Sequence, residues 1–466
     1  MIDNKLKIKH LYWRANFGPS LDTDYSKSYE YHLKTIFDGI KPHQPVVLDY
    51  WNQVKSDYLK DMSAEAKVQY RKNERRARYD IGDAILDRYA GDKNLLREKM
   101  TLFWMGHFAC RVGNPAFMSQ YYNAIAENAL GKFELLLTAM TKNAALLQYL
   151  NNNQNRKAHP NENFARELME LFTLDRGNYT ETDVLESARA LTGWTFTPDG
   201  DFHFRKEHHD DGSKTIFGKT GNFNGDDLIK LILNKSECPT YLVTRIYKFF
   251  VNENVDPIRV KELEAGFIKS GLHIGELMKS IFSSTWFIDS QNVGSKIKSP
   301  VELISGMSRY FKIQFVEPTF RLNLYSVLGQ VLFNPPNVAG WPGGKSWIDS
   351  STLIFRNRLP KVLLSDASVS IEPKKSFDAL ESTPTVAKGN KAKKTNSICD
   401  FDSFLQLTAK LKDDQFCEQL SEILNQKQPS AEVFETIRSF TWKFEGNEKK
   451  IKTAIYLMGL PEYQLS

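Results

Sequence analysis

Apolar residues recur at three- and four-residue steps along most of the chain, the spacing that places them on one face of an α-helix. Residues 92–110 and 121–150 show this spacing over nearly their full length. The same pattern returns in further segments, at 225–234, 239–252, 257–270, 273–284, 299–312 and 321–333. We therefore predict an all-α protein with a large multi-helical main domain over residues 1–365.

One stretch of this domain breaks the helical spacing. Phe202 and Phe204 alternate with polar residues, and Asp-Gly and Gly-Lys turn sequences occur around them within 196–220. Alternation with a period of two is typical of a half-buried strand. We predict a small β-hairpin inserted between helices near 197–221.

The segment 366–398 is rich in Lys, Ser, Thr and Pro and has few large apolar residues. Such a composition buries too little surface to offset the entropy lost on ordering, so we predict a disordered or loose linker. Residues 399–466 return to helical spacing but are too few for a large core. We expect this C-terminal helical segment to pack on the main domain.

The composition is that of a globular protein, with 466 residues of which 41% are hydrophobic and 25% charged. The net charge of +6 is mild for this length and does not indicate a nucleic-acid partner. We predict that the densest basic run, Arg71 to Arg78, is a solvated helix face rather than an anion-binding stripe. No run approaches the ~18 apolar residues of a membrane span, and no secretory signal pattern is seen, so we expect a cytoplasmic location.

The helix predicted over 159–174 has an apolar face and a polar face. Pro160 suits its first turn, where a missing N–H costs nothing. The polar face carries Glu162, Arg166, Glu170 and Thr173, with His159 just before the helix on the same side. The candidates for chemistry are His159, Glu162, Arg166 and Glu170. Arg166 stands four residues from both Glu162 and Glu170, the spacing of ion pairs on a helix.

Two interpretations of this polar face stay open. In the first, which periodicity alone favours, it is a solvated ladder of ion pairs. In the second it lines a cleft, where His159, Glu162 and Glu170 act in acid/base catalysis or bind a metal and Arg166 holds an anionic group.

Further histidines are candidates in two other places. His209 and Asp211, two residues apart, would point to one face of a strand and could hold a divalent metal ion with carboxylates from elsewhere. The alternative is a polar hairpin with an Asp-Asp-Gly turn. His107 lies among aromatic residues and is either a core residue or a catalytic base or ligand that reaches the same cavity as His159.

The sequence GWPGGKS at 340–346 is similar to a phosphate-binding loop but lacks its spacing. The interval from Gly340 to Gly344 is one residue too short, and Pro342 removes a backbone donor, so we exclude nucleotide binding by this motif. We predict a rigid turn whose Trp341 docks on the core, with sugar stacking on Trp341 as the weaker alternative.

Several segments together resemble one known family. They are LYWRANFGPS at 11–20, REKMTLFWMGHF at 97–108, HPNENFARELMELFTL at 159–174, ARALTGWTF at 188–196, HDDGSKTIFG at 209–218, KSPVEL at 298–303 and NPPNVAGWPGG at 334–344. In content and order they are similar to the bacterial family catalogued as domain of unknown function 1800. The resemblance covers nearly the whole chain. The sequence departs from the family at Asp175-Arg176-Gly177, where the family tends to have a glycine directly after Thr-Leu.

This resemblance implies a mostly helical fold and no established activity. Many relatives look exported, so export is the alternative to a cytoplasmic location. Relatives are also encoded beside a phosphatase- or sulfatase-like family, which implies a partner protein of that kind.

The leading hypothesis is an enzyme of unknown reaction, for which we expect metal-assisted or general acid/base hydrolysis or group transfer. Its site would lie between the 159–174 helix, the 97–108 helix and the 203–214 hairpin. His107, His159, Glu162, Arg166 and Glu170 would be catalytic, and His209 and Asp211 would bind the metal. The alternative is a non-catalytic helical scaffold that assists a partner enzyme.

Overall fold

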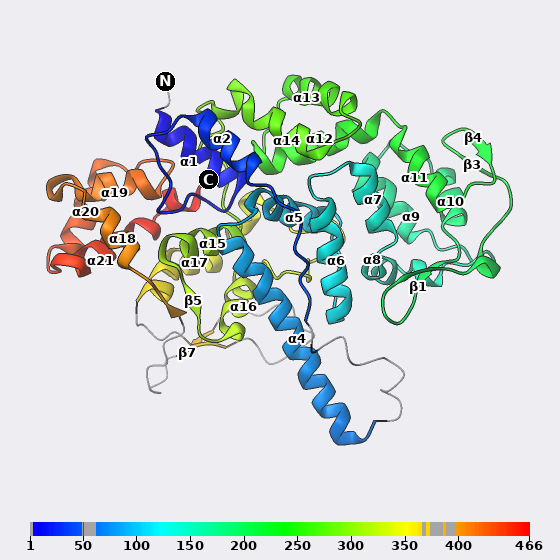
Figure 1. Ribbon diagram of the computed structural model, residues 1–466, viewed down its shortest axis with the longest axis horizontal. Coiled ribbons are helices and arrows are strands. Elements are labelled where there is room, and N and C mark those ends of the chain that lie inside the picture. The colour runs from blue at the N-terminus through cyan, green and yellow to red at the C-terminus, as the bar shows by residue number, and fades with distance from the viewer. Residues whose placement is uncertain (1–2, 49, 51–61, 366–369, 373–384, 388–396) are drawn as a thin grey trace.

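The computed structural model describes residues 3–48, 50, 62–365, 370–372, 385–387 and 397–466. It confirms an all-α fold with small β-hairpins (Figure 1). The N-terminal half contains α1 Asn4–Ala15, α2 Tyr29–Asp38, α4 Ala64–Ala90, α5 Leu95–His107, α6 Pro115–Asn128, α7 Phe133–Thr141, α8 Ala144–Tyr149, α9 Asn163–Met169 and α10 Glu181–Ala190. The helices that follow are α11 Gly225–Leu233, α12 Glu237–Phe250, α13 Pro257–Lys269, α14 Ile274–Ser283, α15 Pro300–Phe311, α16 Pro318–Val327 and α17 Ser350–Leu364.

Helix α5 lies at the centre of the molecule, in contact with α1, α2, α4 and α6 (Figure 1). Almost every side chain of α5 is buried, although the helix carries charged residues in its first turns. Its two buried charges are both paired across the core. Glu98 accepts a hydrogen bond from Tyr122 Oη at 2.5 Å, and Lys99 contacts Glu302 of α15.

The helix predicted over 159–174 is shorter and less regular than expected. Regular α-helix begins at Asn163, so the placement of Pro160 in the first turn was wrong. From Glu170 to Leu174 the chain widens into a π-helical turn. The next helix, α10, starts as its sequence indicates, because Thr180 and Asp183 form a reciprocal capping box.

The predicted hairpin region contains two hairpins rather than one. Strands β1 (Trp194–Phe196) and β2 (Phe202–Phe204) pair antiparallel, and Trp194 lies opposite Phe204. Strands β3 (Lys214–Ile216) and β4 (Lys219–Gly221) form the second pair. His209 and Asp211 lie in the connection between the hairpins, so the expectation that they share a strand was wrong.

The C-terminal helices are α18 Asp402–Thr408, α19 Phe416–Leu424, α20 Ala431–Thr441 and α21 Gly446–Met458. They gather at one end of the molecule (Figure 1) and contact α15 and α17. A short ladder also joins β5 (Gln314–Phe315) to β8 (Ser397–Ile398), and another joins β6 (Ser370–Glu372) to β7 (Thr385–Ala387). Most of the predicted linker at 366–398 lies outside the described residues.

The final residues of the chain return to the core. Lys298 N donates to Gln464 O at 2.8 Å, and Lys296 and Ser466 exchange two backbone hydrogen bonds. This pairing fixes the segment 296–298 between the C-terminus and the start of α15. It therefore sets the backbone from which Lys296 and Lys298 project.

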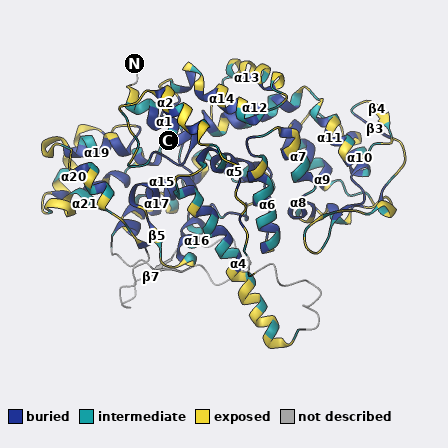
Figure 2. Cartoon of the chain, viewed as in Figure 1, coloured by how far each residue is buried: buried dark blue, intermediate teal, exposed yellow. Residues whose placement is uncertain are grey.

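Helix α4 differs from the others in its surroundings. Its C-terminal half packs in the core through Ile81, Ile85 and Tyr89, whereas the N-terminal half projects from the body and is exposed (Figure 2). None of the helices in the described part of the chain is both long and apolar enough to cross a bilayer.

Candidate functional site

His107 ends α5 in a closed aromatic environment. Its Nε2 lies 3.0 Å from Phe172 O and therefore carries the proton, because a carbonyl only accepts. Its Nδ1 is buried without a partner among the described residues. Burial, with the nearby Arg245 charge, lowers the pKa of His107 to about 3, so the ring is neutral in ordinary buffers.

The polar face of α9 forms ion pairs with its own neighbourhood. Arg166 contacts Glu162 at 3.0 Å and makes a two-point contact with Glu181 at 2.7 and 2.8 Å. The predicted pair of Arg166 with Glu170 is replaced by a pair of Glu170 with Arg176, at 2.7 Å. Arg166 is therefore paired with Glu181, and Glu170 is paired with Arg176. The sequence did not predict either of these two partners.

Glu170 is also held by Tyr179 Oη, which donates to its carboxylate at 2.8 Å. This hydroxyl and the Arg176 guanidinium keep the pKa of Glu170 below its ordinary value. His159 is exposed and lies in a bridge with Arg156 before the helix. The structure thus gives Arg166 and Glu170 separate sets of partners.

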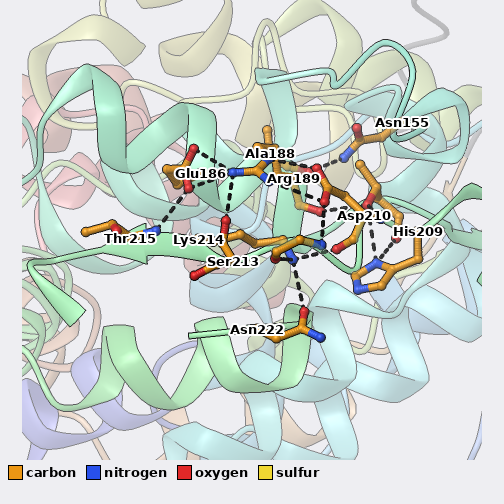
Figure 3. A network of polar contacts seen from close by, with 12 residues as sticks. Asn155, Glu186, Ala188, Arg189, His209, Asp210, Ser213, Lys214, Thr215 and Asn222 are labelled. Atoms are coloured by element: carbon orange, nitrogen blue, oxygen red, sulfur yellow. Dashed lines mark hydrogen bonds and ion pairs between the residues drawn. The ribbon is translucent and has the colours of Figure 1, made fainter. Parts of the chain in front are cut away.

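Figure 3 shows the network around His209 and Asp210, from the connection between the two hairpins. Arg189 contacts Asp210 at 2.7 Å and Glu186 at 2.9 Å. His209 is buried, and its Nδ1 lies 2.9 Å from Thr192 O. Asp211 is exposed, and the carboxylate of Asp210 rather than that of Asp211 belongs to the network.

Within the part of the chain that the structure describes, no three His, Cys, Asp or Glu side chains are grouped as metal ligands. The metal hypothesis for His209 and Asp211 therefore stays a prediction. The structure places these two residues in one connection and His107 in the core. His159, Glu162, Arg166 and Glu170 lie on or beside α9.

A different set of residues surrounds a cavity of about 480 Å³ beside the centre of the molecule. Its walls come from α5, the C-terminal half of α12, the segment 296–299 and the loop 341–347. The charged residues among its lining are Arg245, Lys248, Glu253, Lys296, Glu302 and Lys345. Phe103, Phe249, Trp341 and Trp347 supply aromatic surface.

Glu302 forms a buried ion pair at the floor of this cavity. Its Oε1 lies 2.5 Å from Lys99 Nζ, and its Oε2 accepts a hydrogen bond from the Ser299 amide at 2.7 Å. Burial favours the neutral acid, but Lys99 and Lys296 outweigh it and keep the pKa of Glu302 far below its ordinary value. Glu302 is therefore a fixed negative charge.

Further basic side chains lie close to this pair. Arg14 of α1 donates to Asn292 O at 2.9 Å, while its Nε and Nη1 are buried without a partner among the described residues. Lys298 lies between the rings of Trp13 and Tyr463, at 3.7 and 3.9 Å from their centroids, and burial lowers its pKa well below the ordinary value. Basic side chains thus outnumber Glu302 in this buried region.

Three basic side chains that line the cavity form no ion pair with the described residues. Arg245 and Lys248 stand three residues apart and so lie on one face of α12, and Lys345 lies on the loop. None of these three side chains has a hydrogen bond or ion pair to a described residue. Glu253 is the acid at the mouth, and it is exposed.

The loop 340–347 approaches its neighbours too closely for larger residues. A Cβ on Gly340 would lie 2.2 Å from Gly106 O, and one on Gly344 would lie 2.4 Å from Glu253 Oε1. Both glycines also have positive φ, which disfavours other residues. The loop is a tight turn, as predicted, and Trp341 packs over Gly106 while lining the cavity.

The amides at the start of α15 are already bonded within the protein. Val301 N donates to Gln330 Oε1 at 2.9 Å, and Glu302 N donates to Ser299 Oγ at 3.2 Å. Side chains, and not this helix terminus, are therefore the donors that the cavity offers to a ligand.

Periodicity did not identify these residues as a site. Lys296, Glu302 and Trp341 lie in or beside KSPVEL and NPPNVAGWPGG, segments noted for their family resemblance. Trp341 had a second signal, because the GWPGGKS sequence had already suggested sugar stacking as the weaker alternative for it.

The comparisons with known proteins agree with that resemblance. The model of a family described as protein of unknown function (DUF1800) matches residues 10–465. Searches of curated proteins and of solved structures gave no match. Because the family match extends over nearly the whole chain, this protein belongs to the DUF1800 family.

Proposed function

We propose that the cavity beside Trp341 is the active site of an enzyme that performs acid/base hydrolysis or group transfer on a small organic anion. One observation carries this proposal: Arg245, Lys248 and Lys345 face a single cavity and have no acid partner among the described residues. Structural cations in the same protein, such as Arg166 and Arg189, are paired.

The electrostatics of the cavity support an anionic ligand. Buried Arg14 and Lys99 lie behind its floor, and Glu302 offsets only part of their charge. Low-dielectric walls concentrate such a positive potential in the opening. Hydrogen bonds from ionised donors to an oxyanion are about twice as strong as neutral ones, so guanidinium and ammonium groups suit a carboxylate, sulfate or phosphate.

The aromatic walls fit the organic part of the ligand. Trp341 is half-buried, and its indole Nε1 is enclosed without a hydrogen-bond partner among the described residues. An amphipathic ring of this kind can stack on a sugar or other flat group while donating one hydrogen bond. The substrate that we propose therefore carries a ring and an anionic group.

Calorimetric titration with sulfate, followed by sulfated, phosphorylated and carboxylated sugars, tests the binding step. Arg245→Met should weaken sulfate binding about tenfold or more, since a charge-assisted hydrogen bond contributes about 1.5–3 kcal/mol. Lys219→Met on β4 is the matched control, because Lys219 is exposed far from the cavity lining. Equal weakening by both variants would reject the site.

Turnover tests the enzymatic step separately. A hydrolase screen on the anionic sugars that bind should show product formation that Arg245→Met reduces. Binding without any turnover would leave a ligand-binding protein and reject the enzyme.

A scaffold role is the second candidate, and the projecting half of α4 favours it. Arg71 and Lys72 are exposed there, on a helix that stands clear of the body (Figure 2). We propose that this end of α4 binds an acidic face of a partner protein, such as the phosphatase- or sulfatase-like partner that the family resemblance suggests. Charge reversal by Arg71→Glu and Lys72→Glu should abolish that complex in gel filtration and leave sulfate binding unchanged.

A further inference from the structure

Among the buried lysines described near the cavity, Lys296 lines it, whereas Lys99 and Lys298 do not. Lys99 has the Glu302 carboxylate at 2.5 Å, and Lys298 donates to Tyr463 O at 2.5 Å from between two rings. Lys296 donates to Phe249 O, and its Nζ lies 4.3 Å from the centroid of the Phe249 ring. No carboxylate among the described residues pairs with it, yet it lines the cavity.

The backbone around Lys296 is fixed on both sides. Its amide and carbonyl both bond to Ser466, and the next turn of chain enters the capping box of α15. A buried lysine on such a backbone keeps its amine near one place. A fixed amine that also lines a cavity suits a group that meets a ligand and does not merely fill the core.

Charged groups approach Lys296 from each element that packs around it. They are Arg14 of α1, Lys99 of α5, Arg245 and Lys248 of α12, Glu253 after α12, Glu302 of α15 and Lys345 of the loop. Cations outnumber acids in this set. Burial, together with Arg14 and Lys99, lowers the pKa of Lys296 to about 7 against the opposing effect of Glu302.

We infer that Lys296 is the proton-exchanging group of the cavity, which takes up a proton when an oxyanion binds beside it and returns it during the reaction. This inference rests on the proposed function, because it requires an anion in the cavity. The proton comes from solvent on binding, and the positive amine then balances the negative ligand. The bound ligand therefore meets an ammonium group that can act as a general acid.

The physical reason is the electrostatic coupling between the bound anion and the Lys296 amine inside the poorly solvated cavity. An anion held by Arg245 and Lys345 brings negative charge near the amine and favours its protonated form. By linkage, binding that raises the pKa of a group must draw protons from solution at a pH above the free pKa. A fraction of a proton, up to about one, should be taken up per ligand.

Calorimetry in buffers of different ionisation enthalpy measures this uptake, with sulfate as the probe because it has no proton to exchange near neutral pH. At about one pH unit above the pKa of Lys296, we expect uptake of more than about half a proton. Lys296→Met should bind sulfate without proton exchange. Lys248→Met should weaken binding but keep the uptake, and Lys219→Met should change neither.

The outcomes separate this inference from the proposed function. If sulfate and the anionic sugars do not bind at all, both fail. If sulfate binds without proton uptake, or if Lys296→Met retains the uptake, only the role of Lys296 fails.

Chemical labelling of the amines is a second measurement. It uses the wild-type protein without a ligand, so it does not depend on the folding of a variant. Acetic anhydride modifies neutral amines, so the labelling rate of each lysine follows its titration and can be read by mass spectrometry. In the wild-type protein Lys296 should titrate with a midpoint near 7, well below the value of about 10.4 for a lysine in a model peptide. A midpoint for Lys296 near the model-peptide value of about 10.4 would overturn the inference.

Discussion

Two polar regions of this protein can be compared, the hairpin network around Arg189 and the cavity between α5 and α12. In the network, Arg189 contacts Glu186, Asp210 and the Ser213 carbonyl, and Lys214 donates to two further carbonyls (Figure 3). In the cavity, three cations at the mouth have no acid partner among the described residues. The basic side chains of the first region are paired with carboxylates or carbonyls, whereas those three side chains of the second region are not.

This difference shows why a high density of polar residues is a poor guide to function. A cation whose donors are used by its neighbours stabilises the fold but has little to offer a ligand. A cation held next to low-dielectric walls with free donors is ready to bind an anion. Of the two residues that the sequence singled out in the hairpin region, His209 is buried within the paired network, whereas Asp211 is exposed outside it.

The largest expected effect is the change of the unfolding free energy with pH, which tests the buried amine of the cavity. Burial lowers the pKa of Lys296, and also that of Lys9, to about 7. At these two groups the unfolded chain binds more protons than the folded one above about pH 7, so stability should rise with pH up to about 8.5. From there the buried thiols of Cys110 and Cys238, whose pKa values burial raises, begin to oppose the trend.

Each such lysine adds up to about 1.4 kcal/mol per pH unit. Urea unfolding at several pH values measures the slope, and Lys296→Met should reduce it. A flat profile would show that both amines stay charged in the folded protein. Above about pH 10 the buried tyrosines, whose pKa values are raised, should reverse the trend.

Breaking the ion pair at the cavity floor should have the next largest effect. Glu302→Gln leaves Lys99 buried without its counter-charge, and losing one partner of a buried pair costs about 3–5 kcal/mol. The midpoint of urea unfolding should fall accordingly. The double variant Lys99→Met, Glu302→Leu should regain much of this loss, because neither charge then remains buried alone. Equal losses in the single and double variants would contradict this account of the floor.

Arginines of the two regions should respond in opposite ways. Arg189→Met removes partners of two carboxylates and should cost about 1–3 kcal/mol in unfolding free energy without changing sulfate affinity. Arg245→Met should change stability by less than about 0.5 kcal/mol but weaken sulfate binding. Urea unfolding of both variants in parallel measures this difference. An equal loss of unfolding free energy would contradict the view that Arg189 stabilises the fold and Arg245 does not.

The sequence was sufficient for much of the fold because local physics decides it. Helical spacing identified the segments that form α5 and α12. Its failures were also local: the helix at Pro160 starts later, and two hairpins replace one. Both places make contacts with other segments that spacing does not report. Asn163 Nδ2 donates to Leu150 O, and Phe217 N donates to Asp183 Oδ1.

The candidate site could not be found in the same way. Arg14, Lys99, Arg245, Lys296 and Lys345 come from distant parts of the chain, and no spacing rule links them. Whether a cation is paired depends on which carboxylates lie near it in space. For Arg166 the decisive partner was Glu181, fifteen residues away on the next helix. Periodicity reports which face a residue occupies, but it does not report which donors remain free.

The smallest effect is expected at Arg166, and it provides the sharpest choice between the two candidate sites. Its partners Glu162 and Glu181 are 41% and 76% exposed, and pairs at such positions contribute about 0.2–1 kcal/mol. Arg166→Ala should therefore lower the unfolding free energy only slightly and leave both sulfate affinity and turnover at wild-type values. The paired variant Arg245→Met, tested on the same substrates, supplies the contrast. If Arg166→Ala instead abolished turnover while Arg245→Met did not, catalysis would belong to the polar face of α9. The free cations beside Trp341 would then have some role other than catalysis.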